Sequence, residues 1–373
     1  MSDAPRILFY IKRNLHLPHV EPILRWMETH TPEVQVRVSA PPWIAPTEGL
    51  PGTGLTAAEI DAVKAKGLQW LPYGEIADWS PDATIMADAD YAGLHWPGKL
   101  VNVNHGLISK GWYYTNKPGV QRENQGDLIC VPGPYHAEVL TPMLSKPVVA
   151  TGLVKFDPVG RGELTQQTAR TMFGLPLAAE VVLLAPTFNM ELSAVPVLAD
   201  RARELVHAAA GRGDRHLLIK LHGMAPPVWQ EMYRLLAALE QRIHYVDSAD
   251  LTPSLMAADV VISDVSSAYM EAIALDRPVV LVDNPLQTRY FNYDPNDIEY
   301  RWRDVGVRAK TVDEALAAVD HCFANPEEKV DARRTYGRKL VGDIDGRASE
   351  RAALAILTLL EREELVTKAV ANS

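Results

Sequence analysis

Two serines and two carboxylates lie around a strand-to-helix turn, where their spacing suits the binding of a phosphate group. Asp264, Ser266 and Ser267 follow an apolar run, and Glu271 comes four residues after the second serine. We expect a helix over Ala268–Leu275, and the free N–H groups at a helix start bind anions. Glu271 could then reach the sugar hydroxyls of a nucleotide whose phosphates rest on the turn. The turn therefore predicts a bound nucleotide diphosphate.

An ordinary capped helix explains the same residues without any ligand. Serine and aspartate are common helix caps, so Asp264, Ser266 and Ser267 could simply close the start of the helix. Glu271 would then be an exposed helix residue. On the turn alone, capping is the more frequent arrangement, and the other motifs of the chain must decide.

Two histidines each follow an apolar strand and precede a glycine, which exposes the imidazole at the end of a strand. They are His105 and His222. A histidine can take a proton from a hydroxyl near neutral pH, and it can donate to a phosphate oxygen. We take both as candidate catalytic residues, with His105 as the base. A loop histidine bonded to the backbone is the alternative for each, because a single His-Gly pair carries little motif information.

Three further polar residues are candidates for phosphate binding. Thr187 and Asn189 follow an apolar strand that ends in proline, and Arg347 stands at the expected start of the last helix. Asp345 could cap that helix. Because a cation is disfavoured at a helix start, Arg347 there suggests a nearby anion. The alternatives are an ordinary loop for Thr187 and Asn189 and a solvated side chain for Arg347.

Apolar strands alternate with helices along the chain, as they do in doubly wound α/β sheets. Continuous β-branched runs such as Val260–Ser263 and Pro278–Val282 indicate parallel strands covered on both faces. Other segments that we expect to be strands are Arg6–Ile11, Val34–Val38, Ala83–Ala87, Lys99–Val103, Leu128–Val131, Val148–Gly152, Val181–Ala185, His216–Leu221 and 244–247.

Two series of such elements predict two Rossmann-like domains that face a cleft. We expect an N-terminal acceptor domain at residues 1–155 and a nucleotide domain at residues 156–345. Residues 346–373 should form a helix that closes the chain and packs back towards the first domain. Because ligands bind beyond the carboxyl ends of the strands in such sheets, the polar strand ends of both domains should meet at the cleft.

Composition excludes several classes of protein. The 373 residues carry a formal net charge of −10, which argues against general nucleic-acid binding. Cys130 and Cys322 lack metal-ligand spacing and fit a reducing compartment. Without a leader-like or membrane-spanning run, we expect a cytoplasmic protein, with peripheral contact to the inner membrane face as an option.

No spacing of residues predicts a dedicated metal site. Asp88 and Asp90 would share one face of an extended segment, where a solvated edge is the expected role. We expect no cofactor, although Mg²⁺ could accompany a bound pyrophosphate.

Six segments, in this order, resemble the CDP-glycerol glycerophosphotransferase family of teichoic-acid and capsule synthesis. The resemblance begins near residue 100 and runs to the end of the chain. In the family these segments read His-Gly-Thr-Pro-x-Lys, Gly-x-Pro-Arg-x-Asp, Ala-Pro-Thr-Phe, Leu-His-Pro, Thr-Asp-Tyr-Ser-Ser-x-x-x-(Asp/Glu) and Asp-Gly-Lys-Ala-Ser. The matching segments here are His105–Lys110, Gly152–Asp157, Ala185–Phe188, Leu221–Gly223, Ser263–Glu271 and Asp345–Ser349.

The resemblance implies a GT-B fold and the transfer of an alditol phosphate from a CDP-alditol, with release of CMP. It implies His105 as the base for the acceptor hydroxyl, and His222 and the two serines as pyrophosphate contacts. Glu271 would hold the ribose. Arg347 or Lys110 would neutralise phosphate charge. The acceptor would be a surface polymer or a lipid-linked molecule.

Departures from the family pattern leave other functions open. Leu107 and Ile108 replace the Thr-Pro pair, and Val265 replaces an aromatic residue, so donor and acceptor could differ from the family's. A nucleotide-sugar glycosyltransferase or a UDP-sugar 2-epimerase would use a similar serine turn and ribose-binding glutamate. A non-catalytic nucleotide-binding scaffold is the alternative outside enzymes.

Overall fold

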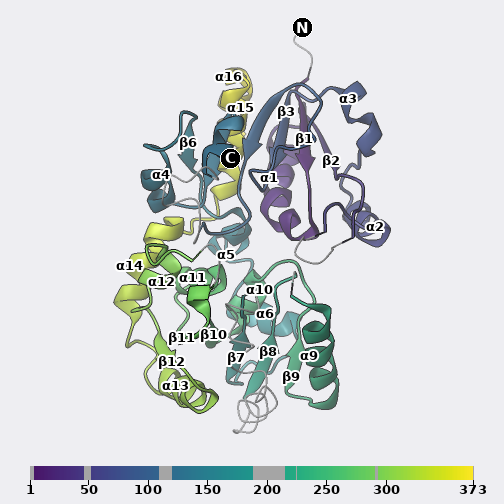
Figure 1. The fold of residues 1–373 in the computed structure, drawn as a ribbon. Helices are drawn as coiled ribbons and strands as arrows, with labels where there is room; N and C mark the ends of the chain where they lie inside the picture. Colours follow the sequence, from purple (N-terminus) through teal and green to yellow (C-terminus); the bar gives the residue numbers. More distant parts are fainter. Residues whose placement is uncertain are drawn as a thin grey trace. The chain divides into compact units, whose positions relative to one another are not determined.

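A computed structural model of the chain describes most of its length as two compact units (Figure 1). Residues 4–106, 120–160 and 343–372 belong to the first unit, and residues 107–108 and 161–342 to the second. The described ranges are 4–45, 52–108, 120–187, 215–223, 225–289 and 293–372. The predicted boundaries are 155/156 and 345/346. The chain crosses between the units at 106/107, where the second unit takes in residues 107–108, and again at 160/161 and 342/343.

The first unit contains a six-stranded parallel sheet in the order β2-β1-β3-β4-β5-β6. Its strands are β1 (Arg6–Tyr10), β2 (Gln35–Ser39), β3 (Ala83–Met86), β4 (Lys99–Asn102), β5 (Leu128–Val131) and β6 (Val148–Ala150). Its α-helices are α1 (Leu17–His30), α2 (Ala57–Ala65), α3 (Ile76–Trp79), α4 (Pro134–Leu140), α5 (Asp157–Gly160), α15 (Ala348–Leu359) and α16 (Glu363–Asn372). Short 3₁₀ turns lie at η1 (Asn14–His16), η2 (Tyr73–Glu75), η4 (Val120–Gln125) and η5 (Val154–Phe156).

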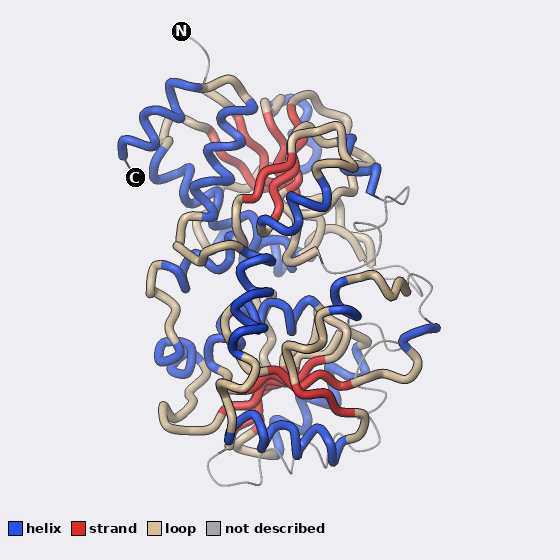
Figure 2. The backbone as a smooth tube through the Cα atoms, turned by 90° about the vertical axis from the view of Figure 1, so that its left-hand side faces the viewer, coloured by secondary structure: helices blue, strands red, loops and turns tan. Residues whose placement is uncertain are grey.

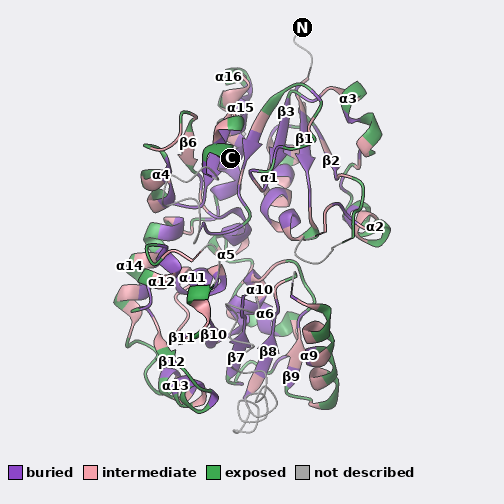
Figure 3. Ribbon diagram, viewed as in Figure 1, coloured by how far each residue is buried: buried purple, intermediate pink, exposed green. Residues whose placement is uncertain are grey.

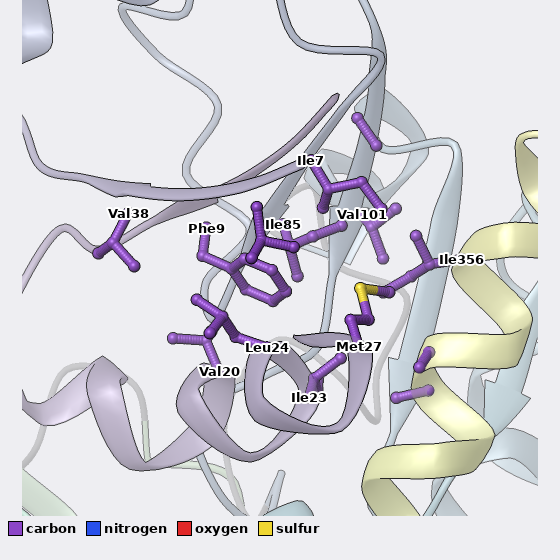
Figure 4. Packing of buried hydrophobic residues seen from close by; sticks show 14 of the residues in the cluster. Ile7, Phe9, Val20, Ile23, Leu24, Met27, Val38, Ile85, Val101 and Ile356 are labelled. Carbon is purple, nitrogen blue, oxygen red and sulfur yellow. The ribbon is translucent and has the colours of Figure 1, made fainter. Parts of the chain in front are cut away.

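The strands β1, β3 and β5 are buried on both faces of this sheet, which explains why they are mostly apolar. Ile7 and Phe9 of β1 point to one face, where they pack with α1 and α15 (Figure 4). Leu8 and Tyr10 alternate with them and pack against Ile76 on the other face. The C-terminal helix α15 therefore completes the core of the N-terminal sheet, although it lies more than 300 residues from β1 in sequence.

The second unit has a parallel sheet in the order β12-β11-β10-β7-β8-β9, the strand order of a Rossmann fold. Its strands are β7 (Val181–Leu184), β8 (His216–Ile219), β9 (Ile243–Tyr245), β10 (Val260–Ser263), β11 (Val279–Val282) and β12 (Val307–Ala309). Its helices are α6 (Gln166–Met172), α9 (Pro227–Leu239), α10 (Thr252–Ala257), α11 (Ser267–Ala274), η7 (Gln287–Arg289), α12 (Ile298–Arg301), α13 (Val312–Ala324) and α14 (Val330–Val341). Strands in red, flanked by blue helices, make the layers visible in each unit (Figure 2), and the strands are largely buried (Figure 3).

The predicted α/β class with two doubly wound sheets is confirmed, and most strand limits agree within one or two residues. The end of the chain differs from the prediction. A single helix was expected from Arg347, but two helices, α15 and α16, form there. Glu361, between them, has a φ of 57°, a left-handed conformation that ends a helix.

Candidate active site

The serine turn of the second unit lies where the strand order of its sheet reverses. Strands β7 and β10 are neighbours there, and their connections run to opposite sides, a position at which doubly wound sheets bind ligands. Thr187 follows β7 and donates its backbone N–H to Asp264 Oδ1, after β10, over 2.9 Å. The Ser266 hydroxyl accepts from the backbone N–H of Ala268 at 3.2 Å and so caps α11. Thr187, Ser266 and Ser267 therefore gather at one strand-end site.

The two carboxylates of this turn are buried rather than solvated. Asp264 is 0% exposed and Glu271 is 4% exposed, so the alternative of an exposed helix residue does not hold for Glu271. Arg303, which no sequence pattern singled out, donates to the Asp264 carbonyl at 3.1 Å and to the Asp283 carboxylate at 3.2 Å. This arginine is 7% exposed, and its bond to the Asp264 carbonyl stabilises the turn from the buried side. Arg303 lies 39 residues after Asp264 in the sequence, so only the fold brings the two residues together.

His222 follows β8, the strand next to β7, and is half-buried. Its carbonyl accepts from the backbone N–H of Ala225 at 2.8 Å, which closes the turn that carries it. The site of the second unit thus draws residues from the ends of three adjacent strands, β8, β7 and β10. Asn189 and Lys110, also predicted for phosphate binding, lie outside the described residues.

In the first unit, a buried polar network presents His105 at the end of β4. Asn104 has a φ of 59°, and its side-chain amide donates to the Cys130 carbonyl at 2.9 Å. The Asn102 amide donates to both oxygens of the fully buried Glu123 carboxylate at 3.0 Å. The side chain of Asn102 also accepts from the Asn104 N–H at 2.9 Å. This network holds the backbone in the left-handed turn from which the His105 side chain emerges.

The His105 ring is bonded to the backbone, as the alternative interpretation expects, but this bond uses only one of its two nitrogens. Its Nδ1 lies 2.7 Å from the Ala87 carbonyl oxygen. Because a carbonyl only accepts, Nδ1 carries a proton, and in the neutral ring Nε2 then carries the lone pair. No hydrogen bond to Nε2 is formed within the described ranges. The ring is therefore oriented and in the tautomer that a base requires.

Two side chains that no sequence motif placed with His105 lie beside it. The His16 ring stacks on it with centroids 5.2 Å apart and planes at 20°. Burial, together with His105, Arg13 and Lys12, holds the pKa of His16 well below its ordinary value, so this ring is neutral. Asp88 lies in the same cluster, and one possible metal-ligand atom from each of His16, Asp88 and His105 lies within 4.8 Å of the others.

Asp88 and Asp90 differ in their surroundings. Lys12 Nζ makes an ion pair with Asp90 Oδ2 at 2.9 Å, and the Asp90 side chain is 53% exposed, as expected for a solvated edge. Asp88 is half-buried and lies with the two imidazoles. All these residues follow β1, β3 or β4, and the strand order of this sheet reverses between β1 and β3. The first unit therefore also has its candidate site at the point of reversal.

The last predicted phosphate ligand, Arg347, is engaged within its own helix start. Its guanidinium donates to Glu350 at 2.8 Å, and this carboxylate raises the pKa of Arg347. Asp345 accepts from the Arg347 N–H at 3.0 Å but does not cap α15 directly. The Asp157 carboxylate does so, because the N–H groups of Ala348 and Ser349 each donate to it at 2.8 Å.

Two of the family-like segments, residues 152–157 and 345–349, therefore contact each other in the first unit, and we call this contact the joint. Asp157 comes from the first segment, and Asp345 and Ser349 belong to the second. Arg351 links them further by donating to the Thr151 carbonyl at 2.7 Å and to Asp345 at 2.7 Å. The Arg351 guanidinium lowers the pKa of Asp345.

We expect Asp157→Ala to lower the free energy of unfolding by about 2 kcal/mol, since two buried N–H groups lose their acceptor. Urea unfolding followed by circular dichroism measures this change. Asp343→Ala, at an exposed carboxylate just before the joint, is the matched control and should change stability little. Equal stability of the two variants would contradict a capping role for Asp157.

Among the described residues, no helix combines the length and apolar character needed to cross a lipid bilayer.

The fold is that of GT-B enzymes, as comparison with solved structures shows. The wall teichoic acid polymerase TagF, in a structure described as an H444N form with CDPG, is similar with a TM-score of 0.69 and 15% identity, over 97% of this chain and 90% of that one. A Staphylococcus aureus MnaA–UDP structure is similar with a TM-score of 0.59 and 14% identity, over 96% and 97% of the two chains. UDP-GlcNAc 2-epimerase from Neisseria meningitidis bound to UDP-GlcNAc gives 0.56 and 14%, over 95% and 100%.

Residues 109–358 match the family described as CDP-glycerol:poly(glycerophosphate) glycerophosphotransferase. This match covers well over half of the chain, so the chain belongs to that family and is a transferase. The matching region includes the serine turn, Glu271 and Arg347, whereas His105, His16 and Asp88 precede it. No curated protein matches the chain in sequence.

Proposed function

We propose that this enzyme transfers glycerol phosphate from CDP-glycerol to a hydroxyl of a polymeric or lipid-linked acceptor and releases CMP. Membership of the glycerophosphotransferase family carries the proposal. The arrangement of Thr187, Ser266 and Ser267 at the point of strand reversal supports it, because a helix start at such a point suits a pyrophosphate.

In the proposed reaction, Nε2 of His105 takes the proton of the acceptor hydroxyl. The acceptor oxygen then attacks the phosphorus that carries glycerol. A new oxygen–phosphorus bond forms in line with the bond to CMP, which breaks, and CMP leaves with the electron pair. Catalysis of this kind depends on positioning and on charge stabilisation around the phosphates. His222, Ser266 and Ser267 would supply donors to the pyrophosphate, and Glu271 would bind the ribose.

A second candidate function is a reaction of a UDP-sugar. The observation that favours it is the similarity of the fold to one structure with UDP and one with UDP-GlcNAc. Nucleotide preference separates the two functions. We expect CDP and CDP-glycerol to raise the melting temperature of the protein more than UDP and UDP-GlcNAc do. A clear preference for uridine would contradict the CDP-glycerol proposal. Binding of CDP-glycerol with no release of CMP when candidate acceptors are supplied would favour a non-catalytic scaffold.

Ser267→Ala tests the serine turn as the donor site. Loss of one hydrogen bond to a charged phosphate should raise the KM for CDP-glycerol about tenfold with a smaller change in kcat. Thr171→Ala removes an exposed hydroxyl from α6 of the same unit and serves as the control. A KM equal to that of the unaltered enzyme in Ser267→Ala would place the pyrophosphate elsewhere.

A further inference from the structure

Three possible metal ligands converge in the first unit from the ends of three adjacent strands. His16 follows β1, Asp88 follows β3 and His105 follows β4. One ligand atom from each lies within 4.8 Å of the other two. Ligand atoms on one tetrahedral zinc ion lie roughly 3.4 Å apart, so small side-chain rotations would close the set around an ion.

His16 is the member that needs a ligand. Its side chain belongs to a residue that is 1% exposed, and its Nε2 has no hydrogen-bond partner in the described part of the chain. Buried polar atoms are nearly always satisfied, so an unpaired one calls for an explanation. A metal ion bound at Nε2, in the plane of the ring, would provide the missing interaction.

The other two ligands are also available. The Ala87 carbonyl orients His105 through Nδ1 and leaves Nε2 for an ion, as second-layer partners commonly do for metal-binding histidines. Within the described ranges, Asp88 makes no hydrogen bond or ion pair. The positive charge of Lys12 is offset by its ion pair with Asp90 rather than by Asp88.

Two imidazoles and one carboxylate favour zinc-like ions over magnesium, because Mg²⁺ prefers oxygen ligands. We propose that His16, Asp88 and His105 form a binding site for Zn²⁺, and that the bound ion inhibits transfer by occupying the Nε2 lone pair of His105. The binding stands by itself, whereas the inhibition rests on the proposed function, in which that lone pair takes the acceptor's proton.

Binding is tested first, with full-length protein that carries no affinity tag. Calorimetric titration with ZnSO₄ should show one ion per chain at this site, and His16→Ala and Asp88→Asn should each weaken its affinity at least tenfold. Asp88→Asn keeps the test decisive if the buried His16→Ala variant fails to fold, because Asp88 is only half-buried. The matched control is His244→Ala, which disrupts a different imidazole pair, His216 Nδ1 to His244 Nε2 at 3.0 Å. We expect this variant to keep the affinity of the site.

Inhibition is tested next on CMP release from CDP-glycerol. Zn²⁺ should inhibit, a chelator should restore the rate, and the inhibitory concentration should rise at least tenfold in Asp88→Asn, relative to its own zinc-free rate. Absence of binding, or binding that His16→Ala and Asp88→Asn leave unchanged, overturns the metal site and leaves the transferase function standing. Binding as expected without inhibition supports the site, and it overturns both the inhibition and His105 as the base.

Discussion

His105→Ala is expected to lower kcat for glycerophosphate transfer by about 10²–10⁴-fold, the range that a general base contributes. In the neutral ring Nε2 carries the lone pair, because Nδ1 keeps its proton and donates it in a hydrogen bond to the Ala87 carbonyl. The stacked His16 is a poor replacement, since this ring is buried and burial holds its pKa well below the ordinary value. The acceptor hydroxyl would then have to lose its proton to water.

The measurement is CMP release from CDP-glycerol under saturating acceptor, together with the melting temperature and the affinity for CDP. Folding and CDP affinity should persist, because the serine turn belongs to the other unit and the polar network of Asn102, Asn104 and Glu123 does not include the His105 ring. His30→Ala is the matched control: this imidazole lies at the far end of α1 and bonds the Trp26 carbonyl. An unchanged kcat in His105→Ala would remove this histidine from the mechanism.

The sequence predicts best those parts of the fold that local physics decides. β10 is predicted at its observed limits because a β-branched run buried on both faces has few alternatives. The Thr-x-x-Glu spacing of Thr56 and Glu59 is typical of a capping box, and in the structure these side chains bond each other's backbone N–H at the start of α2. The start of α11 after β10 is also decided locally, because the Ser266 side chain caps this helix.

Long-range pairings explain what the sequence could not predict. Asp157 caps a helix that begins 191 residues later, and Asp345, three residues before that helix, is the more obvious local candidate. His16 and Asp88 meet His105 only because β1, β3 and β4 are adjacent in the sheet. No spacing within one segment signals such a cluster. A parallel sheet assembles its sites from strand ends that are far apart in the chain, so sequence patterns identify the individual ends better than their partners.

A motif shared with a family can therefore mark a joint rather than a ligand site. Residues 152–157 and 345–349 resemble two family segments, and in this structure they bond each other. Arg347 stands in the second of them with its charge directed to Glu350. The structural account of these segments is that they fix α15 against the N-terminal sheet, where the helix completes the core.

Gly160→Ala is expected to lower the free energy of unfolding by about 3 kcal/mol or more, and it tests the packing at this joint. A Cβ at Gly160 would lie 2.1 Å from the backbone nitrogen of Gly346 and 2.7 Å from its Cα. These neighbours are backbone atoms, so no side-chain rotation can relieve the overlap. The two segments would have to separate, which would also pull the Asp157 carboxylate away from the start of α15.

Gly74→Ala is the matched control, because a Cβ there meets nothing within 4 Å and the same unit contains it. Urea unfolding of both variants, followed by circular dichroism, gives the comparison. We expect Gly74→Ala to stay within about 0.5 kcal/mol of the unaltered protein, as exposed substitutions usually do. If Gly160→Ala were equally stable, residues 157–160 and 345–349 would not pack as closely as this structure shows, and α15 would be held by its apolar face alone.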